Sequence, residues 1–142
     1  MGTSFQVTFD CADPDALAGF WAEALGYVKQ PPPEGHASWD DFLREAGIPK
    51  NRWTAFSAVV DPDGKAPRIF FQKVPEPKAV KNRVHLDVNV GAGLEGEERR
   101  RKVEQEAERV QGLGASKVRP FDQDGEFWIV MQDPEGNEFC LQ

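Results

Sequence analysis

Apolar and polar residues alternate in several short stretches of the chain and follow a helical spacing in others. In SFQVTFDC (4–11), Phe5, Val7 and Phe9 alternate with polar residues, which predicts a half-buried strand. Similar β-rich runs predict further strands over 54–60, 68–74, 83–90, 116–120, 126–132 and 137–142.

Three segments have the features of helices. Asp13 is a plausible N-cap and Pro14 suits a first helical turn, so a helix is expected from there to Gly26. A second is expected over 38–49, capped by Ser38 and with an apolar stripe of Trp39, Phe42, Leu43 and Ala46. A third is expected over about 96–112, with Val103, Ala107 and Val110 facing inward. The connection over 27–37, rich in proline, is expected to be irregular.

The order of these elements occurs twice. Each half has a strand, a helix and three strands, and the turns DPDG (61–64) and DPEG (133–136) occupy matching places. Recurrence of the whole order indicates an internal duplication. The chain is therefore expected to form one domain of two modules, 1–78 and 79–142, with the helix near 38–49 inserted in the first.

The strand NRVHLDVNV (82–90) has two unlike faces. Four aliphatic side chains lie on one face, and Arg83, His85, Asp87 and Asn89 lie on the other. Such a polar face is either solvated or lines a pocket.

Composition narrows the class of protein. A chain of 142 residues suits a single domain. Its net charge of −7 argues against nucleic acid as a partner, and the basic run 99–102, set among glutamates, predicts a solvated helix face. No apolar stretch is long enough to span a membrane, and the N-terminus lacks a signal-peptide pattern. Two cysteines, Cys11 and Cys140, are too few for a disulfide framework, so we expect a cytoplasmic protein.

Three stretches carry a resemblance to a known family. DCADPDALAGFWAEALGY after the first strand, NRVHLDVNV opening the second half, and the terminal DPEGNEFCLQ resemble the vicinal oxygen chelate superfamily, and in particular its glyoxalase-like domain proteins. That superfamily includes glyoxalase I, bleomycin-resistance proteins and extradiol dioxygenases. The resemblance implies an α+β fold in which two tandem βαβββ modules form a curled mixed sheet, a cup with helices on its convex face.

The resemblance also implies a small-molecule ligand in the cup, a divalent metal in the enzymes, and a homodimer. It places Arg83, His85, Asp87 and Asn89 toward the cup, with Val84, Leu86 and Val88 packed under the second-module helix.

The family's metal-ligand positions carry over incompletely. They fall on Gln6 of the first strand, on Phe70 or Gln72 of the fourth, on Arg83 of the fifth with His85 two residues further, and on Cys140 of the eighth. A guanidinium cannot ligate a metal, and no carboxylate stands at these positions. A set of Gln6, His85 and Cys140 could hold zinc, or less typically nickel, manganese or iron.

Without a metal, the same residues suggest a recognition surface. Arg83 could clamp a carboxylate or phosphate, and His85 could act as a general base with Asp87 fixing its tautomer. Walls of the ligand site are expected from Phe70, Gln72, Trp53 and Trp128.

Three hypotheses follow. The first is a glyoxalase-like protein that binds a small organic molecule in the cup. The second is a metal-dependent lyase, isomerase or dioxygenase, and the third a resistance-type protein that sequesters an aromatic or cationic drug. Simpler interpretations also stand: His85 as a hydrogen-bonded structural residue, Cys140 as a small buried hydrophobe, and Arg83 and Asp87 as a surface ion pair.

Overall fold

Each half of the chain forms its own four-stranded mixed sheet. The computed structural model describes residues 1–142, which divide into two units, Met1–Pro77 and Lys78–Gln142. The strand orders are β1-β4-β3-β2 and β5-β8-β7-β6, so the first strand of each unit lies beside the fourth. The predicted α+β fold of two βαβββ modules is confirmed.

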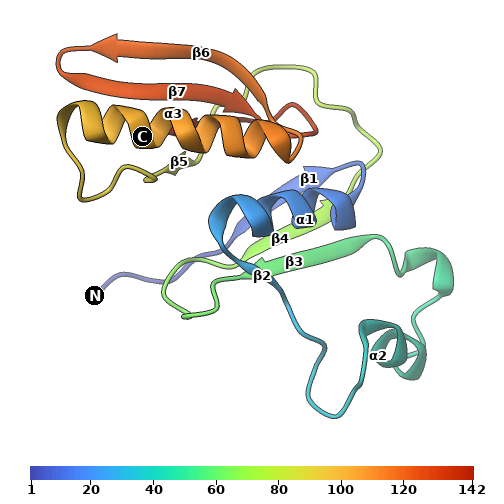
Figure 1. Ribbon diagram of the computed structural model, residues 1–142. Coiled ribbons are helices and arrows are strands. Elements are labelled where there is room, and N and C mark those ends of the chain that lie inside the picture. Colours follow the sequence, from blue (N-terminus) through green and yellow to red (C-terminus); the bar gives the residue numbers. More distant parts are fainter. The chain divides into compact units, whose positions relative to one another are not determined.

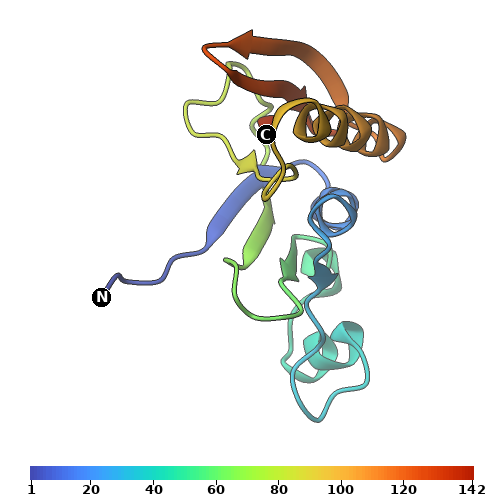
Figure 2. The same cartoon turned by 60° about the vertical axis from the view of Figure 1, so that its left-hand side comes forward.

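The first module holds seven elements. They are β1 (Val7–Cys11), α1 (Pro14–Leu25), β2 (Val28–Lys29), α2 (Trp39–Glu45), a 3₁₀ helix (Lys50–Arg52), β3 (Phe56–Val60) and β4 (Ile69–Lys73). β4 runs parallel to β1 and antiparallel to β3, and β2 extends the sheet on the far side of β3. Figures 1 and 2 show α2 on a long excursion of the chain between β2 and β3.

Helix α1 begins and ends as the sequence predicts. The Asp13 carboxylate accepts a hydrogen bond from the backbone N–H of Ala16, and Gly26 ends the helix at a φ of 70°, a conformation that suits glycine. Its buried side chains include Leu17 and Trp21, each 1% exposed. They pack against the β3 and β4 side of the sheet, where Val59 and Phe71 are fully buried.

The second module repeats this plan. Its elements are β5 (Asp87–Val88), α3 (Gly96–Gly112), β6 (Ser116–Gln123), β7 (Glu126–Gln132) and β8 (Glu138–Leu141). Figure 1 shows α3 running along β6 and β7. The helix buries the three predicted residues Val103, Ala107 and Val110, and one face of the sheet buries Phe127, Ile129, Met131, Phe139 and Leu141. The other face of this sheet is left for the side chains that alternate with these.

One side-chain hydrogen bond recurs at equivalent places in the two modules. Gln72 of β4 donates from Nε2 to the Asp10 carboxylate at 2.7 Å, and Gln142 donates from Nε2 to the Asn89 side-chain oxygen at 2.9 Å. In both modules the bond joins the ends of the parallel strand pair. The duplication therefore extends to single contacts.

The two DPxG turns are built by their first aspartates, as predicted. Asp61 accepts hydrogen bonds from three backbone N–H groups that follow it, and Asp133 accepts from those of Glu135 and Asn137 and from the Asn137 side chain. These bonds lower the pKa of Asp61, the Asp63 N–H contributing most. Asp133 is only 3% exposed, although the turn that it forms lies at the surface, with Pro134 exposed.

Several sequence predictions were wrong in detail. The strand predicted over 83–90 forms ladder pairs only at Asp87–Val88, and Val84 is 84% exposed instead of packing under a helix. The stretch 27–37 contains β2, which pairs with β3 and was missed because two residues carry no periodicity. The apolar stripe of α2 contains no buried residue, although Ser38 caps that helix as expected.

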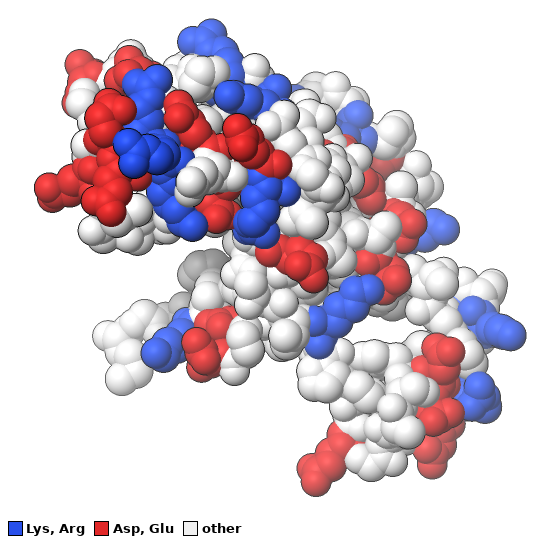
Figure 3. All heavy atoms as spheres, in the orientation of Figure 1, with Lys and Arg blue, Asp and Glu red and all other residues white.

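The outward face of α3 is a mixture of both charges (Figure 3). Arg100 pairs with Glu104, and Lys102 and Arg109 both pair with Glu106. Two residues of the basic run 99–102, Arg100 and Lys102, therefore form salt bridges on the helix surface as predicted, whereas Arg99 donates to the backbone carbonyl of Phe127. None of the helices has the length and hydropathy needed to cross a membrane.

Candidate functional site

A pocket of about 430 Å³ opens on the face of the second-module sheet away from α3. Its lining includes three residues predicted from the sequence, His85, Asp87 and Trp128, and the predicted metal ligand Cys140. Lys81, Phe121, Glu126, Val130, Glu138 and Gln142 complete the lining. All these residues come from one module, so the site is formed by a single sheet and the segment that precedes it.

The pocket is centred on a chain of three polar side chains. Nδ1 of His85 lies 2.7 Å from Oδ1 of Asp87, and the Cys140 thiol hydrogen-bonds to the same carboxylate. The parallel pairing of β5 with β8 sets Asp87 directly beside Cys140. Asp87 therefore joins the imidazole to the thiol, while Nε2 of His85 has no partner within the chain.

Cys140 is a thiol rather than a thiolate at neutral pH. Burial raises its pKa, and the charge of Asp87 and the hydrogen bond to it raise the pKa further, to about 11. Cys140 as a whole residue is 8% exposed. A thiol that is protonated and buried is a weak nucleophile, which argues against a role for Cys140 in covalent catalysis.

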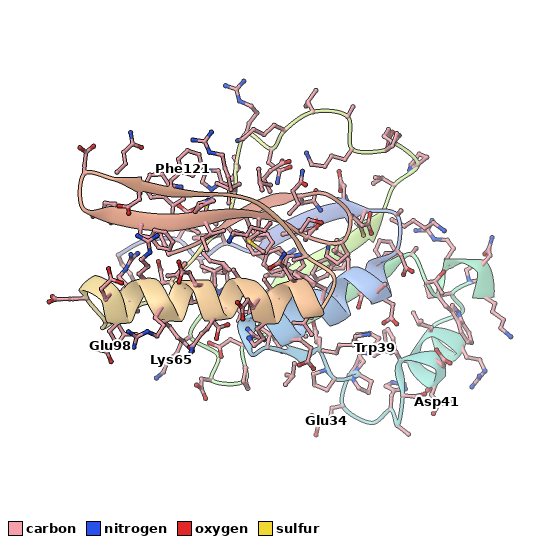
Figure 4. All side chains as sticks on the ribbon, turned by 45° about the horizontal axis from the view of Figure 1, so that its top comes forward. Glu34, Trp39, Asp41, Lys65, Glu98 and Phe121 are labelled. Carbon is pink, nitrogen blue, oxygen red and sulfur yellow. The ribbon has the colours of Figure 1, made fainter.

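Two aromatic rings form one wall. Phe121 of β6 faces Trp128 of β7 across the ladder, and their rings stack with centroids 5.1 Å apart and planes 4° apart. Figure 4 labels Phe121 on β6, on the side of the strand away from α3. The guanidinium of Arg119 covers Phe121, 4.1 Å from the ring centroid. The two rings give the pocket an aromatic wall, and the Arg119 guanidinium lies against Phe121 of that wall.

Glu138 fixes the edge of the pocket. Its carboxylate accepts hydrogen bonds from the backbone N–H of Asn82 and the side chain of Gln132, and pairs with Lys78 at 3.0 Å. Although burial opposes ionisation, these bonds together lower the pKa of Glu138 to about 2. Glu138 is therefore a carboxylate that ties the segment before β5 to the sheet, and its charge is already offset.

Arg83 does not line the pocket. It lies four residues before β5 and forms no hydrogen bond or ion pair, although Asp87 had been a predicted partner. The strand geometry that would aim Arg83 and His85 to the same side is lost because regular pairing starts only at Asp87.

The remaining predicted site residues lie in the first module. Gln72 is bonded to Asp10, and Phe70 stacks on Phe56 with centroids 5.6 Å apart. Trp53 donates from Nε1 to the Ile48 carbonyl and lies under the Arg44 guanidinium. Gln6 accepts a hydrogen bond from Nη1 of Arg68 at 2.9 Å.

Sequence reasoning missed Phe121, Glu126 and Glu138. Alternation on the strands 126–132 and 137–142 gives Trp128, Glu126 and Glu138 their common face. The missing knowledge was the register of β6, which was predicted to end at 120 and in fact continues to Gln123. Only that longer strand brings Phe121 opposite Trp128.

The comparisons with known proteins agree with this two-module fold. The profile of the glyoxalase-like domain family matches residues 6–142. The chain belongs to the glyoxalase-like domain family. It is thus a member of the vicinal oxygen chelate superfamily, as the sequence motifs predicted. A search of curated proteins finds no matching sequence.

Solved structures share the family fold at low identity. A fosfomycin resistance protein, FosX, from Listeria monocytogenes, complexed with Mn(II) and 1S,2S-dihydroxypropylphosphonic acid, aligns with a TM-score of 0.65 and 14% identity, over 100% of this chain and 93% of that one. A glyoxalase/bleomycin resistance protein/dioxygenase family enzyme from Burkholderia phytofirmans aligns with a TM-score of 0.60 and 16% identity, over 96% and 94%. TioX from Micromonospora aligns at 0.53 and 14%, over 99% and 97%.

The family's metal positions fit a divalent ion poorly in this chain. The oxygen of Gln6 is occupied by Arg68, whose positive charge would repel a metal ion beside it. Phe70 offers no ligand atom. Two of the predicted ligands, His85 and Cys140, do come together in the second module, where their donor atoms and those of Asp87 lie within 4.8 Å of one another. Imidazole, carboxylate and thiolate are all zinc ligands, so by type this set suits zinc.

Proposed function

We propose that the protein binds a small, flat organic molecule in the His85–Asp87 pocket of the second module. The observation that carries this proposal is the stacked pair of Phe121 and Trp128 on the pocket wall, with ring planes 4° apart. Parallel rings offer a flat ligand both apolar area and a stacking partner. Small-molecule pockets typically combine such walls with a few polar groups.

Charge favours a cationic or neutral ligand over an anionic one. Asp87 and Glu126 line the pocket, and Lys81 is the only lysine or arginine among the lining residues; Arg119 lies outside the lining, with its guanidinium over the Phe121 ring. Glu138 also lines it, but Lys78 offsets its charge. The absence of Arg83 from the lining removes the main reason to expect a carboxylate or phosphate here. This balance supports the resistance-type hypothesis of an aromatic, cationic ligand.

His85 supplies a directional contact. Asp87 accepts from Nδ1 when that nitrogen carries the proton, which leaves Nε2 as an acceptor for a donor on the ligand. His85 and Trp128 both belong to the pocket lining. A ligand with a flat ring and an ammonium or hydroxyl group satisfies both.

The experiment uses naphthylmethylamine, naphthylmethanol and naphthoate as matched probes. We expect the amine to bind best, to quench tryptophan fluorescence and to shift the amide NMR signals of β7 and β8. Trp128→Leu should weaken its binding about tenfold or more, and His85→Ala about threefold. Trp39→Leu, on α2, is the control and should bind as the parent protein does. Equal binding by the Trp128→Leu variant would refute the proposal.

A second candidate function is a metal-dependent lyase, isomerase or dioxygenase. It is favoured by the three donor atoms of His85, Asp87 and Cys140 within 4.8 Å. Binding must displace the proton of a thiol whose pKa is about 11, so affinity should rise steeply with pH. Titration calorimetry with zinc, nickel, manganese and iron tests this function directly. Stoichiometric binding that strengthens with pH and is lost in Cys140→Ser would establish the site, and no binding at either pH 7 or pH 9 would exclude it.

A further inference from the structure

Arg68 carries a positive charge that is held in place but not neutralised. It lies directly before β4 in the first module. Arg44, Arg100 and Arg109 each pair with a carboxylate, whereas Arg68 forms no ion pair. Its bonding partners are neutral amides, so the full charge of the guanidinium remains available.

Two glutamines orient this guanidinium. Nε donates to the side-chain oxygen of Gln30 at 2.6 Å, and Nη1 donates to that of Gln6 at 2.9 Å. Gln30 follows β2 and Gln6 precedes β1, so the edge strand on one side and the parallel strand on the other both fix Arg68. These bonds use two of the five N–H groups of the guanidinium. The three that remain, including both on Nη2, suffice to hold a carboxylate in a forked pair.

An aromatic surface lies beside the charge. The guanidinium carbon of Arg68 lies 5.2 Å from the ring centroid of Phe70, and Phe70 stacks on Phe56 at 5.6 Å with planes 21° apart. Phe56 is 48% exposed, and a second unpaired guanidinium, that of Arg52, lies 5.6 Å from its ring. The register places both rings on the face of the sheet opposite the buried Val59 and Phe71.

The one carboxylate expected on this face is already engaged. Asp10 pairs with Gln72 in the β1–β4 register and accepts the hydrogen bond from its side chain. The bond to a neutral amide leaves the negative charge of Asp10 in place, but the guanidiniums of Arg68 and Arg52 outnumber it. The net local charge is therefore positive, in contrast to the acidic pocket of the second module. An exposed aromatic pair flanked by two unpaired guanidiniums suits a flat organic anion.

We propose that the Arg68 surface (Gln6, Gln30, Phe56, Arg68 and Phe70) of the first module is a binding site for a small aromatic carboxylate. The carboxylate forks onto Arg68, and the ring lies on Phe56. Pre-orientation by Gln6 and Gln30 lowers the entropy lost on binding. This site does not depend on the pocket of the second module, and the two take ligands of opposite charge.

The test measures naphthoate binding by titration calorimetry and by the NMR signal of the Arg68 Nε–H. We expect a Kd on the order of 0.1–1 mM, as ligands of this size commonly show. Arg68→Gln should weaken binding at least tenfold, and Arg68→Lys, which keeps the charge but not the fork, about threefold. Gln6→Ala and Gln30→Ala should each weaken it a fewfold, because the charge stays but its orientation is lost. The control is Arg101→Gln, which removes an exposed, unpaired arginine from α3.

Each outcome is decisive. If naphthoate binds the Arg68→Gln variant as tightly as the parent, or if naphthylmethanol binds the Trp128→Leu variant as tightly as naphthoate does, the proposal is wrong. If Arg68→Gln does not fold, Arg68→Lys and the two glutamine variants carry the test. Trp128→Leu should leave naphthoate binding unchanged, so failure of this proposal and failure of the second-module ligand site are separately visible.

Discussion

Asp87 and Cys140 lie side by side on the parallel strands β5 and β8, and the Cys140 thiol donates a hydrogen bond to the Asp87 carboxylate. The same carboxylate lies 2.7 Å from Nδ1 of His85. One aspartate thus raises the pKa of the thiol and holds the imidazole by a short contact. The family position that usually carries a ligand for a metal is held here as a neutral, hydrogen-bonded thiol.

The first prediction concerns the reactivity of this thiol. With a pKa of about 11 instead of 9.0, Cys140 should carry about 100-fold less thiolate at pH 8 than an ordinary cysteine. Asp87→Asn removes the charge that raises the pKa, so the pKa should fall while burial keeps it above 9.0. Alkylation rates across pH 7–10, measured in a Cys11→Ala background, report both values. An unchanged rate profile in Asp87→Asn would contradict the prediction.

The raised pKa also predicts how stability depends on alkaline pH. A folded thiol that holds its proton to about pH 11 stabilises the fold below pH 9, and this contribution is lost as pH rises from 9 to 11. Urea unfolding at pH 8 and pH 10.5 should therefore show a smaller difference in Cys140→Ala than in the parent protein.

Glu138 gives the opposite prediction at acid pH. Its pKa is lowered from 4.5 to about 2, so its contribution to stability is full above pH 4.5 and is lost as pH falls toward 2. Because the side chain is 11% exposed, Glu138→Gln should lower the free energy of unfolding at pH 7 by about 1–3 kcal/mol. The loss should vanish near pH 2. Urea unfolding at pH 7, 4 and 2.5 measures it, and Glu126→Gln serves as a control for a carboxylate of the same sheet.

The paired turns provide an internal comparison. Asp133 is buried and accepts three hydrogen bonds at one oxygen, whereas Asp61 is more exposed at the matching position. We expect Asp133→Ala to destabilise the protein by about 2 kcal/mol, because its half-buried amide partners in Glu135 and Asn137 would lose their hydrogen bonds. Asp61→Ala should cost less, because water can replace the lost carboxylate. Thermal unfolding of the two variants in parallel measures the two losses of stability. An equal loss in both would contradict the role given to the burial of Asp133.

The fold was predictable where periodicity and turn chemistry agree. The capped helix ending at Gly26, the long helix ending near Gly112 and both DPxG turns follow from local sequence, and their recurrence identified the modules. The strand at 83–90 shows the limit of this reasoning. Alternation specifies which side chains share a face only while the backbone stays paired, and β8 pairs with no residue before Asp87 in the ladder.

The candidate site was predictable mainly where its residues lie on regularly paired strands. His85, Asp87, Trp128 and Cys140 come together because β5, β8 and β7 are neighbours in the predicted module. Arg83 lies outside because it precedes the pairing. The Arg68 charge was not foreseen, because its meaning depends on Gln30 and Gln6, which lie 38 and 62 residues away. No local sequence pattern shows that the hydrogen-bond partners of an arginine will be amides instead of carboxylates.

The charge of the second-module pocket yields a final prediction, in which two substitutions act in opposite directions. Glu126 and Lys81 both line the pocket beside the aromatic wall. Glu126→Gln removes a negative charge and should weaken naphthylmethylamine binding about two- to fivefold, while Lys81→Gln removes a repulsive cation and should strengthen it by a similar factor. Both effects should shrink when salt is raised from 0.05 to about 0.5 M, since the charges are partly exposed. Glu108→Gln, on the outer face of α3, changes the net charge equally and should have no effect. If all three variants changed affinity in proportion to net charge alone, the attraction would come from the net charge of the whole acidic chain. The charges that line the pocket would then not explain the binding of the cation.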